Sequence, residues 1–197
     1  QNKVLKAISG GFSALLPIIM VGAIASLLSG LNIEAYQNFI VAIGLKPIVA
    51  YISAYTTNMM AIYAVFSIGH SMAKQLECKD QSILVGIISL MVFLLTIPLG
   101  VTKDEVTIAA AISTTYFGAP GLFTAMIIGC IVPLIYNIFV KNHIAIKMPD
   151  GVPPQIANGF SAIIPAVCIT AIFAAIRQLC ALTSFGTLSG LIYGILK

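Results

Sequence analysis

Long stretches without a charged residue constrain the fold of this chain more than any other feature. Asp, Glu, Lys and Arg are absent from five segments, each longer than the roughly 20 apolar residues that an α-helix needs to cross a ~30 Å hydrocarbon core. Charged residues make up 8% of the sequence, whereas a soluble domain carries about a quarter. A water-facing surface cannot be built from such a chain. The uncharged segments are residues 7–33, 47–73, 81–102, 106–140 and 151–176.

The predicted fold is an all-α, polytopic membrane helical bundle with about five transmembrane helices plus amphipathic interfacial helices. The alternating ten-residue strands of an outer-membrane barrel are missing, and the first apolar run is too long for a signal peptide. Because the joining loops are short, we expect residues 1–197 to form one domain. The chain starts with Gln1 rather than Met, so we also expect it to be a piece of a longer protein. The spans are expected at about residues 7–31, 48–73, 82–101, 117–140 and 160–182.

Lysines near the ends of the spans predict the orientation of the chain. Positively charged residues are more frequent in cytoplasmic loops than in outer ones. If the amino end is cytoplasmic, more lysines fall inside than outside, so the sequence predicts an amino end in the cytoplasm. The inner set would be Lys3, Lys6, Lys74, Lys79, Lys141 and Lys147, and the outer set Lys46, Lys103 and Lys197.

Three segments between or after the spans have more than one interpretation. Residues 32–47 place apolar side chains at steps of three and four, which favours an amphipathic helix at the outer interface, although a plain loop helix fits as well. Residues 106–120 contain Gly and Pro, and they fit either a re-entrant segment or an outer surface loop with a short helix. Residues 183–197 fit an interfacial helix or a truncated sixth span.

The loop between the fourth and fifth spans, residues 141–159, is the most distinctive segment. Prolines fix φ and remove backbone donors, while the Asp-Gly pair supplies turn chemistry, so we expect a rigid cytoplasmic loop. A simple linker is the alternative. Its basic flank suits an anionic or phosphorylated partner, or anionic lipid. The residues expected to face this partner are Lys141, Lys147, Pro149, Asp150, Gly151, Pro153 and Pro154.

Three polar residues in the spans are candidates for substrate binding. Asn58 falls near the middle of the second span, where its amide would bond either to a sugar hydroxyl or to a neighbouring helix. His70 shares a helix face with aromatic residues, but an interfacial histidine is the simpler interpretation. Arg177 lies near the outer end of the fifth span, where it would either contact substrate or extend to the lipid headgroups.

Three motifs resemble a known family of membrane proteins. They are LKAISGGFSALLPIIMVGAI at residues 5–24, FGAPGLFTAMIIG at 117–129, and IKMPDGVPPQIANGFSAIIP around the distinctive loop. Together they are similar to enzyme IIC of the bacterial phosphotransferase system (PTS), in its lactose/cellobiose/diacetylchitobiose branch. The MPDGVPP loop is the most specific of the three. The likeness covers almost the whole chain and matches the amino-terminal half of such a subunit.

This resemblance implies a function and a set of partners. Enzyme IIC is the sugar permease of the system, so the expected substrate is a β-linked disaccharide such as cellobiose, and the expected location is the bacterial inner membrane. The family's subunits are homodimers of ten-span chains that work with enzymes IIB and IIA. Their sugar-contacting His and Glu belong to the second half, so none is assigned here. This chain is expected to supply scaffold and dimer surface.

No constellation of catalytic or metal-binding residues is visible in the sequence. We therefore expect no catalytic residue, no cofactor, no metal and no nucleic acid partner in this chain, and its standing as an enzyme subunit stays open. The four cysteines form no CxxC pair, which favours reduced structural thiols. Two alternative functions remain. One is an ion-coupled secondary transporter, and the other is a non-transporting membrane assembly subunit.

Overall fold

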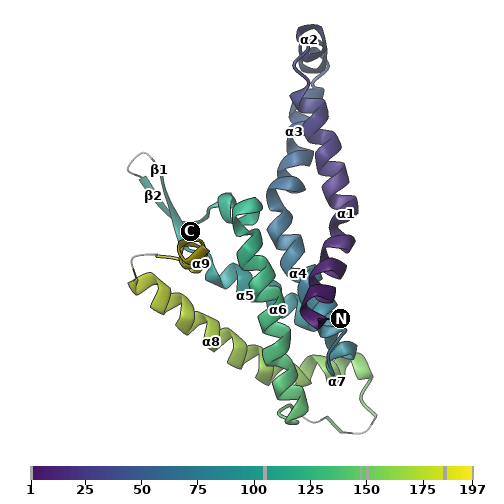
Figure 1. Ribbon diagram of the computed structural model, residues 1–197, viewed down its shortest axis with the longest axis vertical. Coiled ribbons are helices and arrows are strands. Elements are labelled where there is room, and N and C mark those ends of the chain that lie inside the picture. The colour runs from purple at the N-terminus through teal and green to yellow at the C-terminus, as the bar shows by residue number, and fades with distance from the viewer. Residues whose placement is uncertain (1, 104–105, 147, 150, 184–185, 197) are drawn as a thin grey trace.

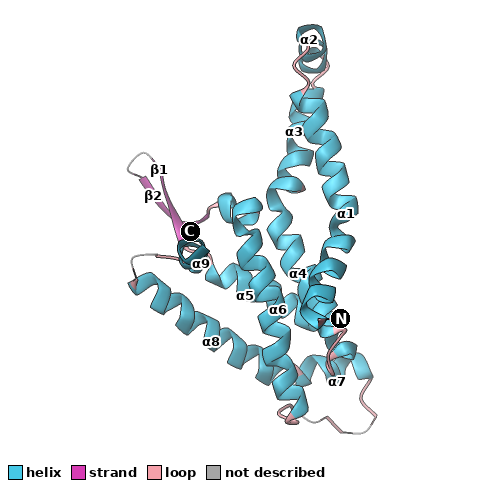
Figure 2. Ribbon diagram, viewed as in Figure 1, coloured by secondary structure: helices cyan, strands magenta, loops and turns pink. Residues whose placement is uncertain are grey.

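The computed structural model describes residues 2–103, 106–146, 148–149, 151–183 and 186–196. Within these ranges the chain is almost entirely helical, as predicted, with a single pair of strands (Figures 1 and 2). The helices are α1 (Lys3–Gly30), α2 (Glu34–Ala42), α3 (Leu45–Tyr55), α4 (Met60–Ala73), α5 (Ser82–Thr96), α6 (Ala119–Lys141), α7 (Pro154–Ser161), α8 (Ile163–Leu182) and α9 (Leu188–Leu196). Short 3-10 turns are η1 (Thr57–Met59), η2 (Lys79–Gln81) and η3 (Thr114–Phe117), and the strands are β1 (Leu99–Lys103) and β2 (Val106–Ile112).

Five helical segments of the described chain are long and apolar enough to cross a membrane. Two of them consist of two helices in series, α3 with α4 and α7 with α8. The segments are Lys3–Gly30, Leu45–Ala73, Lys79–Thr96, Ala119–Lys141 and Pro154–Leu182. The chain is therefore a multi-pass membrane protein of the predicted class.

The second span is not the continuous helix that the sequence analysis expects over residues 48–73. Helix α3 ends at Tyr55, and Thr56 leaves helical geometry with φ −112° and ψ −84° before η1 and α4 follow. The expected amphipathic segment 32–47 is also divided, because Gly44 adopts a left-handed φ of +69° between α2 and α3. Such a φ suits glycine, which has no Cβ to clash.

The third span ends at Thr96 rather than at residue 101. Ile97 is extended, with φ −83° and ψ 134°, as expected for a residue that precedes a proline. The chain then forms the antiparallel pair of β1 and β2, in which Leu99 faces Ile112 and a bulge lies between Leu99 and Val101. Residues 106–112 belong to this hairpin, which neither interpretation of residues 106–120 includes, and Thr114–Phe117 form the short helix η3.

Helix α4 is the centre of the bundle and packs against α1, α5 and α6. Small residues bring these helices close together. A Cβ placed on Gly69 would lie 2.6 Å from the hydroxyl of Ser89 on α5, and one on Gly11 would lie 2.9 Å from Cα of Ile68. In a membrane, where hydrophobic burial gives no net drive between helices, this close packing is a principal source of cohesion.

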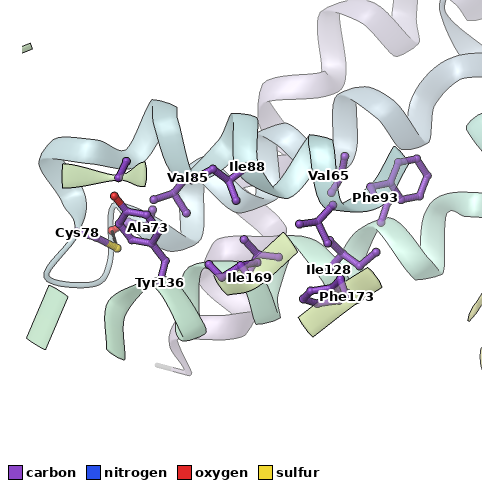
Figure 3. Close-up of a cluster of buried hydrophobic side chains, with 14 of the residues drawn as sticks. Val65, Ala73, Cys78, Val85, Ile88, Phe93, Ile128, Tyr136, Ile169 and Phe173 are labelled. Atoms are coloured by element: carbon purple, nitrogen blue, oxygen red, sulfur yellow. Dashed lines mark hydrogen bonds between the residues drawn. The ribbon is translucent and has the colours of Figure 1, made fainter. Parts of the chain in front are cut away.

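One apolar cluster joins α4, α5, α6 and α8 (Figure 3). In the close-up, Val65, Phe93, Ile128 and Phe173 gather at one end, while Tyr136 lies beside Cys78 at the other. These side chains are nearly inaccessible, with Val65 and Ile128 both at 0% exposure. The cluster fixes the relative positions of four of the five spans.

The far halves of α1 and α3 form an arm that extends away from this cluster, with α2 at its tip (Figure 1). Three side-chain hydrogen bonds hold the tip to α1: Tyr36 donates to Leu28 O (2.9 Å), and Gln37 donates to the carbonyls of Ser29 and Leu31 (3.2 and 2.7 Å). The arm exposes large apolar side chains, among them Leu27 at 63%.

We predict that Gly11→Ala destabilises the protein. The added Cβ would press on the backbone of Ile68, whose Cα and N lie 2.9 and 3.0 Å away. Overpacking of this kind costs about 1–3 kcal/mol, which exceeds the gain of about 1 kcal/mol that alanine brings to a helix. The melting temperature of the purified protein in detergent should therefore fall.

Gly30→Ala is the matched control on the same helix. No atom lies within 4 Å of a Cβ built there, so its melting temperature should be unchanged or slightly higher. Equal melting temperatures for the two variants would contradict the close packing of α1 on α4.

Candidate functional site

A polar cluster ties three spans together at the end of the bundle where α4 finishes. The hydroxyl of Tyr136 on α6 donates to Gln81 Oε1 at 2.7 Å, and the Gln81 amide donates to Ser161 Oγ at 2.8 Å and to Asn158 Oδ1 at 3.3 Å. Tyr136 is 1% exposed. We call Gln81, Tyr136, Asn158 and Ser161 the Gln81 cluster. It fixes the start of the fifth span against the third and fourth.

A second contact at this end joins α6 to the loop after α4. The buried Asn137 side chain accepts a 3.0 Å hydrogen bond from the backbone N–H of Glu77. Glu77 also lies 3.4 Å from the ammonium group of Lys141, but both side chains are more than half exposed. An exposed ion pair of this kind contributes little stability. The amide contact is therefore the stronger positioning element.

A pocket of 280 Å³ lies beside the Gln81 cluster, and the chain that follows α6 forms one of its walls. Its lining includes Gln81, Tyr136 and His143. His143 has a left-handed φ of +52°, an unusual geometry for a residue other than glycine. The loop that the sequence analysis singles out therefore leaves α6 through a sharp turn.

The structure describes most of the residues predicted to face a partner. Lys141 is the last residue of α6, and Pro149 is exposed. Gly151 has φ +102°, which favours glycine. Pro154 begins α7 and Pro153 precedes it, the usual place for proline at a helix start. Lys147 and Asp150 lie outside the described residues.

Asn58 lies near the middle of the second span, as predicted, but at a break and not within a continuous helix. It lies in η1, at the break between α3 and α4, and its side chain is exposed. A Cβ on Gly118 would be 3.1 Å from Asn58 O, so the break packs directly on the start of α6. Asn58 lines a groove of 640 Å³ between α3, η1, η3 and the first residues of α6, which we call the Asn58 groove.

The other two predicted substrate residues lie elsewhere. His70 is near the end of α4, where its ring stacks on Phe66 with centroids 6.2 Å apart and planes 3° apart. Its Nδ1 is buried and has no hydrogen-bond partner in the described part of the chain. Arg177 is half-buried on α8. Neither residue lines the Asn58 groove, so the structure does not bring the three candidates together.

The four cysteines are free thiols, as expected for structural residues. Cys78 lies outside the spans, in the loop after α4, and is 2% exposed. Burial raises the pKa of its thiol to about 11, and the neighbouring Glu77 adds to this shift. Cys78 is thus protonated at neutral pH. Among the described residues, no group of three or more His, Cys, Asp or Glu is placed to hold a metal ion.

The Gln81 cluster is not predicted from the sequence. Gln81 begins an uncharged run and Ser161 lies at the start of the expected fifth span, and an uncharged polar residue at such a place is the only signal that the sequence offers. The tyrosine was hidden inside an apolar stretch. A polar side chain at the end of a span usually faces the headgroups, so its partner on another span could not be read from the sequence.

The comparisons with known proteins agree with this architecture. The pattern of the family described as "Phosphotransferase system, EIIC" matches residues 9–196. The chain belongs to the PTS EIIC family. It is also similar to a solved structure, the crystal structure of the transporter ChbC, the IIC component from the N,N'-diacetylchitobiose-specific PTS. That likeness has a TM-score of 0.91 and 30% identity, and it covers 100% of this chain and 47% of the other.

Three EIIC relatives show the same partial coverage. The lichenan permease IIC component of Bacillus subtilis is 30% identical over 95% of this chain and 43% of its own length. The cellobiose-specific EIIC component of Geobacillus stearothermophilus is 27% identical over 100% and 45%. The lactose-specific EIICB component of Staphylococcus epidermidis is 30% identical over 91% and 30%. This EIIC chain therefore spans less than half the length of these relatives.

We predict that Gln81→Leu lowers the melting temperature of this EIIC chain. The change leaves the buried hydroxyl of Tyr136 without its acceptor, which costs about 1–3 kcal/mol. Adding Tyr136→Phe should recover part of the loss, because removing both partners avoids a buried unpaired group. Gln75→Leu is the control, since the Gln75 side chain donates to Ser71 O within its own turn (3.2 Å). Equal melting temperatures for Gln81→Leu and Gln75→Leu would show that the Gln81 cluster does not stabilise the contact between the spans.

We also predict that Cys78 resists alkylation at neutral pH. With a pKa of about 11, roughly one thiol in a few thousand is ionised at pH 7.5, and only the thiolate reacts. Peptide mass spectrometry after iodoacetamide treatment should show slow labelling of Cys78 and fast labelling of an exposed Asn142→Cys at the same end. Because the folded pKa lies above the unfolded one near 9, Cys78 should also make folding less favourable as pH rises from 9 to 11. Fast labelling of Cys78 at pH 7.5 would contradict its burial.

Proposed function

We propose that this chain is the amino-terminal half of a sugar-translocating EIIC subunit, in which it supplies scaffold and dimer surface. The observation that carries the proposal is the match of the whole five-span unit to one half of the diacetylchitobiose transporter's IIC component. The packing of α4 against three other helices gives this unit a rigid core. Such a core is what a scaffold for moving sugar-binding elements requires.

The proposed substrate is a β-linked disaccharide such as cellobiose. The relatives support this class, since their names refer to lichenan, cellobiose and lactose. The described spans contain few groups able to carry a coupled ion: His70 and Arg177 lie on different helices and near helix ends. This distribution favours phosphorylation-driven uptake over the ion-coupled alternative.

The proposed partner is enzyme IIB, with IIA behind it, at the end of the bundle that carries the Gln81 cluster. The lactose-specific relative is named EIICB, which supports a IIC and IIB pairing. Lys141, Pro149 and Pro153 are exposed at this end. In the predicted orientation it faces the bacterial cytoplasm, where basic side chains also favour anionic lipid.

A homodimer through the arm of α1 and α3 completes the proposal. Helix α1 has 28 residues and is therefore about 42 Å long, which exceeds a hydrocarbon core of ~30 Å. Part of the apolar arm must then be tilted or covered by protein, and a second copy would cover it. Leu27 and Ile24, at 63% and 56% exposure, are available for that contact.

Uptake by the full-length subunit tests the transport function. Cells that express it together with IIA and IIB should accumulate phosphorylated cellobiose, lactose or N,N′-diacetylchitobiose, and uptake should stop when phosphoenolpyruvate is depleted. Uptake of unphosphorylated sugar that follows a sodium or proton gradient would overturn the proposal. Copurification in hetero-complexes, without uptake, would instead favour a membrane assembly subunit.

Cross-linking tests the dimer. A Leu27→Cys variant of the full-length subunit should form a covalent dimer with a short bis-maleimide in membranes. Leu182→Cys is the matched control, because it is equally apolar and even more exposed, at 77%, but lies on α8 away from the arm. The wild-type protein, with its native cysteines, supplies the background. Cross-linking of Leu182→Cys and not of Leu27→Cys would place the contact on another face.

A further inference from the structure

We propose that the Asn58 groove is a binding site for a neutral sugar at the end of the bundle opposite the Gln81 cluster. In the predicted orientation this end faces outward, so the groove would hold the sugar before translocation. The inference rests on the proposed function. It assigns to this half of the subunit a direct contact with substrate in addition to its role as scaffold.

The chemistry of the lining fits a sugar better than an ion or a metabolite with charged groups. None of the described lining residues is charged. The polar groups of the lining residues include the amide of Asn58 and the hydroxyls of Thr57, Thr114 and Thr115, which can both donate and accept hydrogen bonds. The rings of Tyr51 and Tyr55 supply flat apolar surface, which suits the C–H faces of a pyranose.

The amide of Asn58 is exposed, whereas the hydroxyls of Thr56 and Tyr63 bond to carbonyls at the break. The Oγ1 of Thr57 is buried and has no hydrogen-bond partner among the described residues. Thr56 donates its hydroxyl to Ile52 O at 2.6 Å, and Tyr63 donates to Tyr55 O at 2.8 Å, so both satisfy carbonyls at the break of the second span. Within the described chain, the Asn58 side chain makes no hydrogen bond and is exposed. The backbone carbonyls at the break are therefore satisfied without the Asn58 amide.

The groove also has a size and a continuation that suit an oligosaccharide. Its volume of 640 Å³ falls within the range of about 300–1,000 Å³ that is typical of small-molecule sites. A second pocket of 420 Å³ shares Thr115 and Pro120 with it. Helix α9 closes that pocket from the other side, where Tyr193 donates to Pro120 O at 2.7 Å. Its wall adds the hydroxyl of Ser189, so the neutral, hydroxyl-rich lining continues.

Glycine keeps the groove in its present shape. Because a Cβ on Gly118 would lie 3.1 Å from Asn58 O, a larger residue would push the break away from α6 and displace the amide. Tyrosines at a membrane interface also serve as anchors. Anchoring at the interface does not require an amide and two threonines on the facing wall. Loss of Asn58 should therefore weaken sugar binding but leave anchoring by the tyrosines unchanged.

Uptake kinetics of the full-length subunit test the site. The probe is whichever of cellobiose, lactose and N,N′-diacetylchitobiose the wild type takes up with the lowest KM. Asn58→Ala should raise KM about three- to tenfold, the effect of losing one or two hydrogen bonds, and should leave the maximal rate nearly unchanged. Thr115→Val should act in the same direction. Asn38→Ala is the matched control, because Asn38 is also exposed but lies on α2 at the tip of the arm, away from the groove.

Thiol labelling tests the same site without relying on uptake. Asn58→Cys in intact cells should react with a membrane-impermeant methanethiosulfonate, and each of the three sugars that binds should slow the reaction. Asn142→Cys should react only in inverted vesicles and without protection. Melting temperatures of Asn58→Ala and Asn58→Cys should match the wild type, since Asn58 makes no internal hydrogen bond within the described residues.

The outcomes separate this inference from the proposed function. Phosphoenolpyruvate-dependent uptake with an unchanged KM in Asn58→Ala, and no protection of Asn58→Cys, would overturn the sugar site and leave the proposed function standing. Protection without phosphoenolpyruvate-dependent uptake would support the site and overturn the proposed function. Labelling of Asn58→Cys only in inverted vesicles would overturn its outward position.

Discussion

Close backbone approach along α4 is the interaction on which the rest of the structure depends. In lipid the drive to bury apolar side chains is nearly absent, so cohesion comes from contacts that small residues allow. Gly11 on α1 and Gly69 on α4 bring α4 against α1 and α5. The apolar cluster around Val65 then joins α4 to α5, α6 and α8. The arm, the hairpin and the two polar ends are all positioned relative to this core.

The class of fold could be predicted from the sequence because charge-free length is a direct physical signal. A segment such as residues 7–33 has no environment other than a membrane in which it is stable as a helix. The breaks within the helical spans were harder to predict. The break at Thr56 occurs between residues that tolerate helix, and it persists because Tyr63 and Thr56 supply bonds to the freed carbonyls. Those partners are defined only in three dimensions.

The candidate sites also differ in whether the sequence could indicate them. The MPDGVPP loop and Asn58 attracted notice because their residue types are rare in apolar chains, and the structure places both at ends of the bundle. The Gln81 cluster was invisible because each member alone is an ordinary polar residue near a headgroup region. The hairpin of β1 and β2 was missed for a related reason: its strands pair only with each other, next to a helix that Pro98 ends.

The Gln81 cluster has a consequence for the order in which the protein is made. Gln81 enters the membrane early in synthesis, but Asn158 and Ser161 are translated only after the fourth span is complete. Until then, the N–H groups of the Gln81 amide lack their final partners. The arrival of α7 supplies them. The fifth span therefore completes the hydrogen bonds that connect the third, fourth and fifth spans, so the unit is complete only when its last span has been inserted.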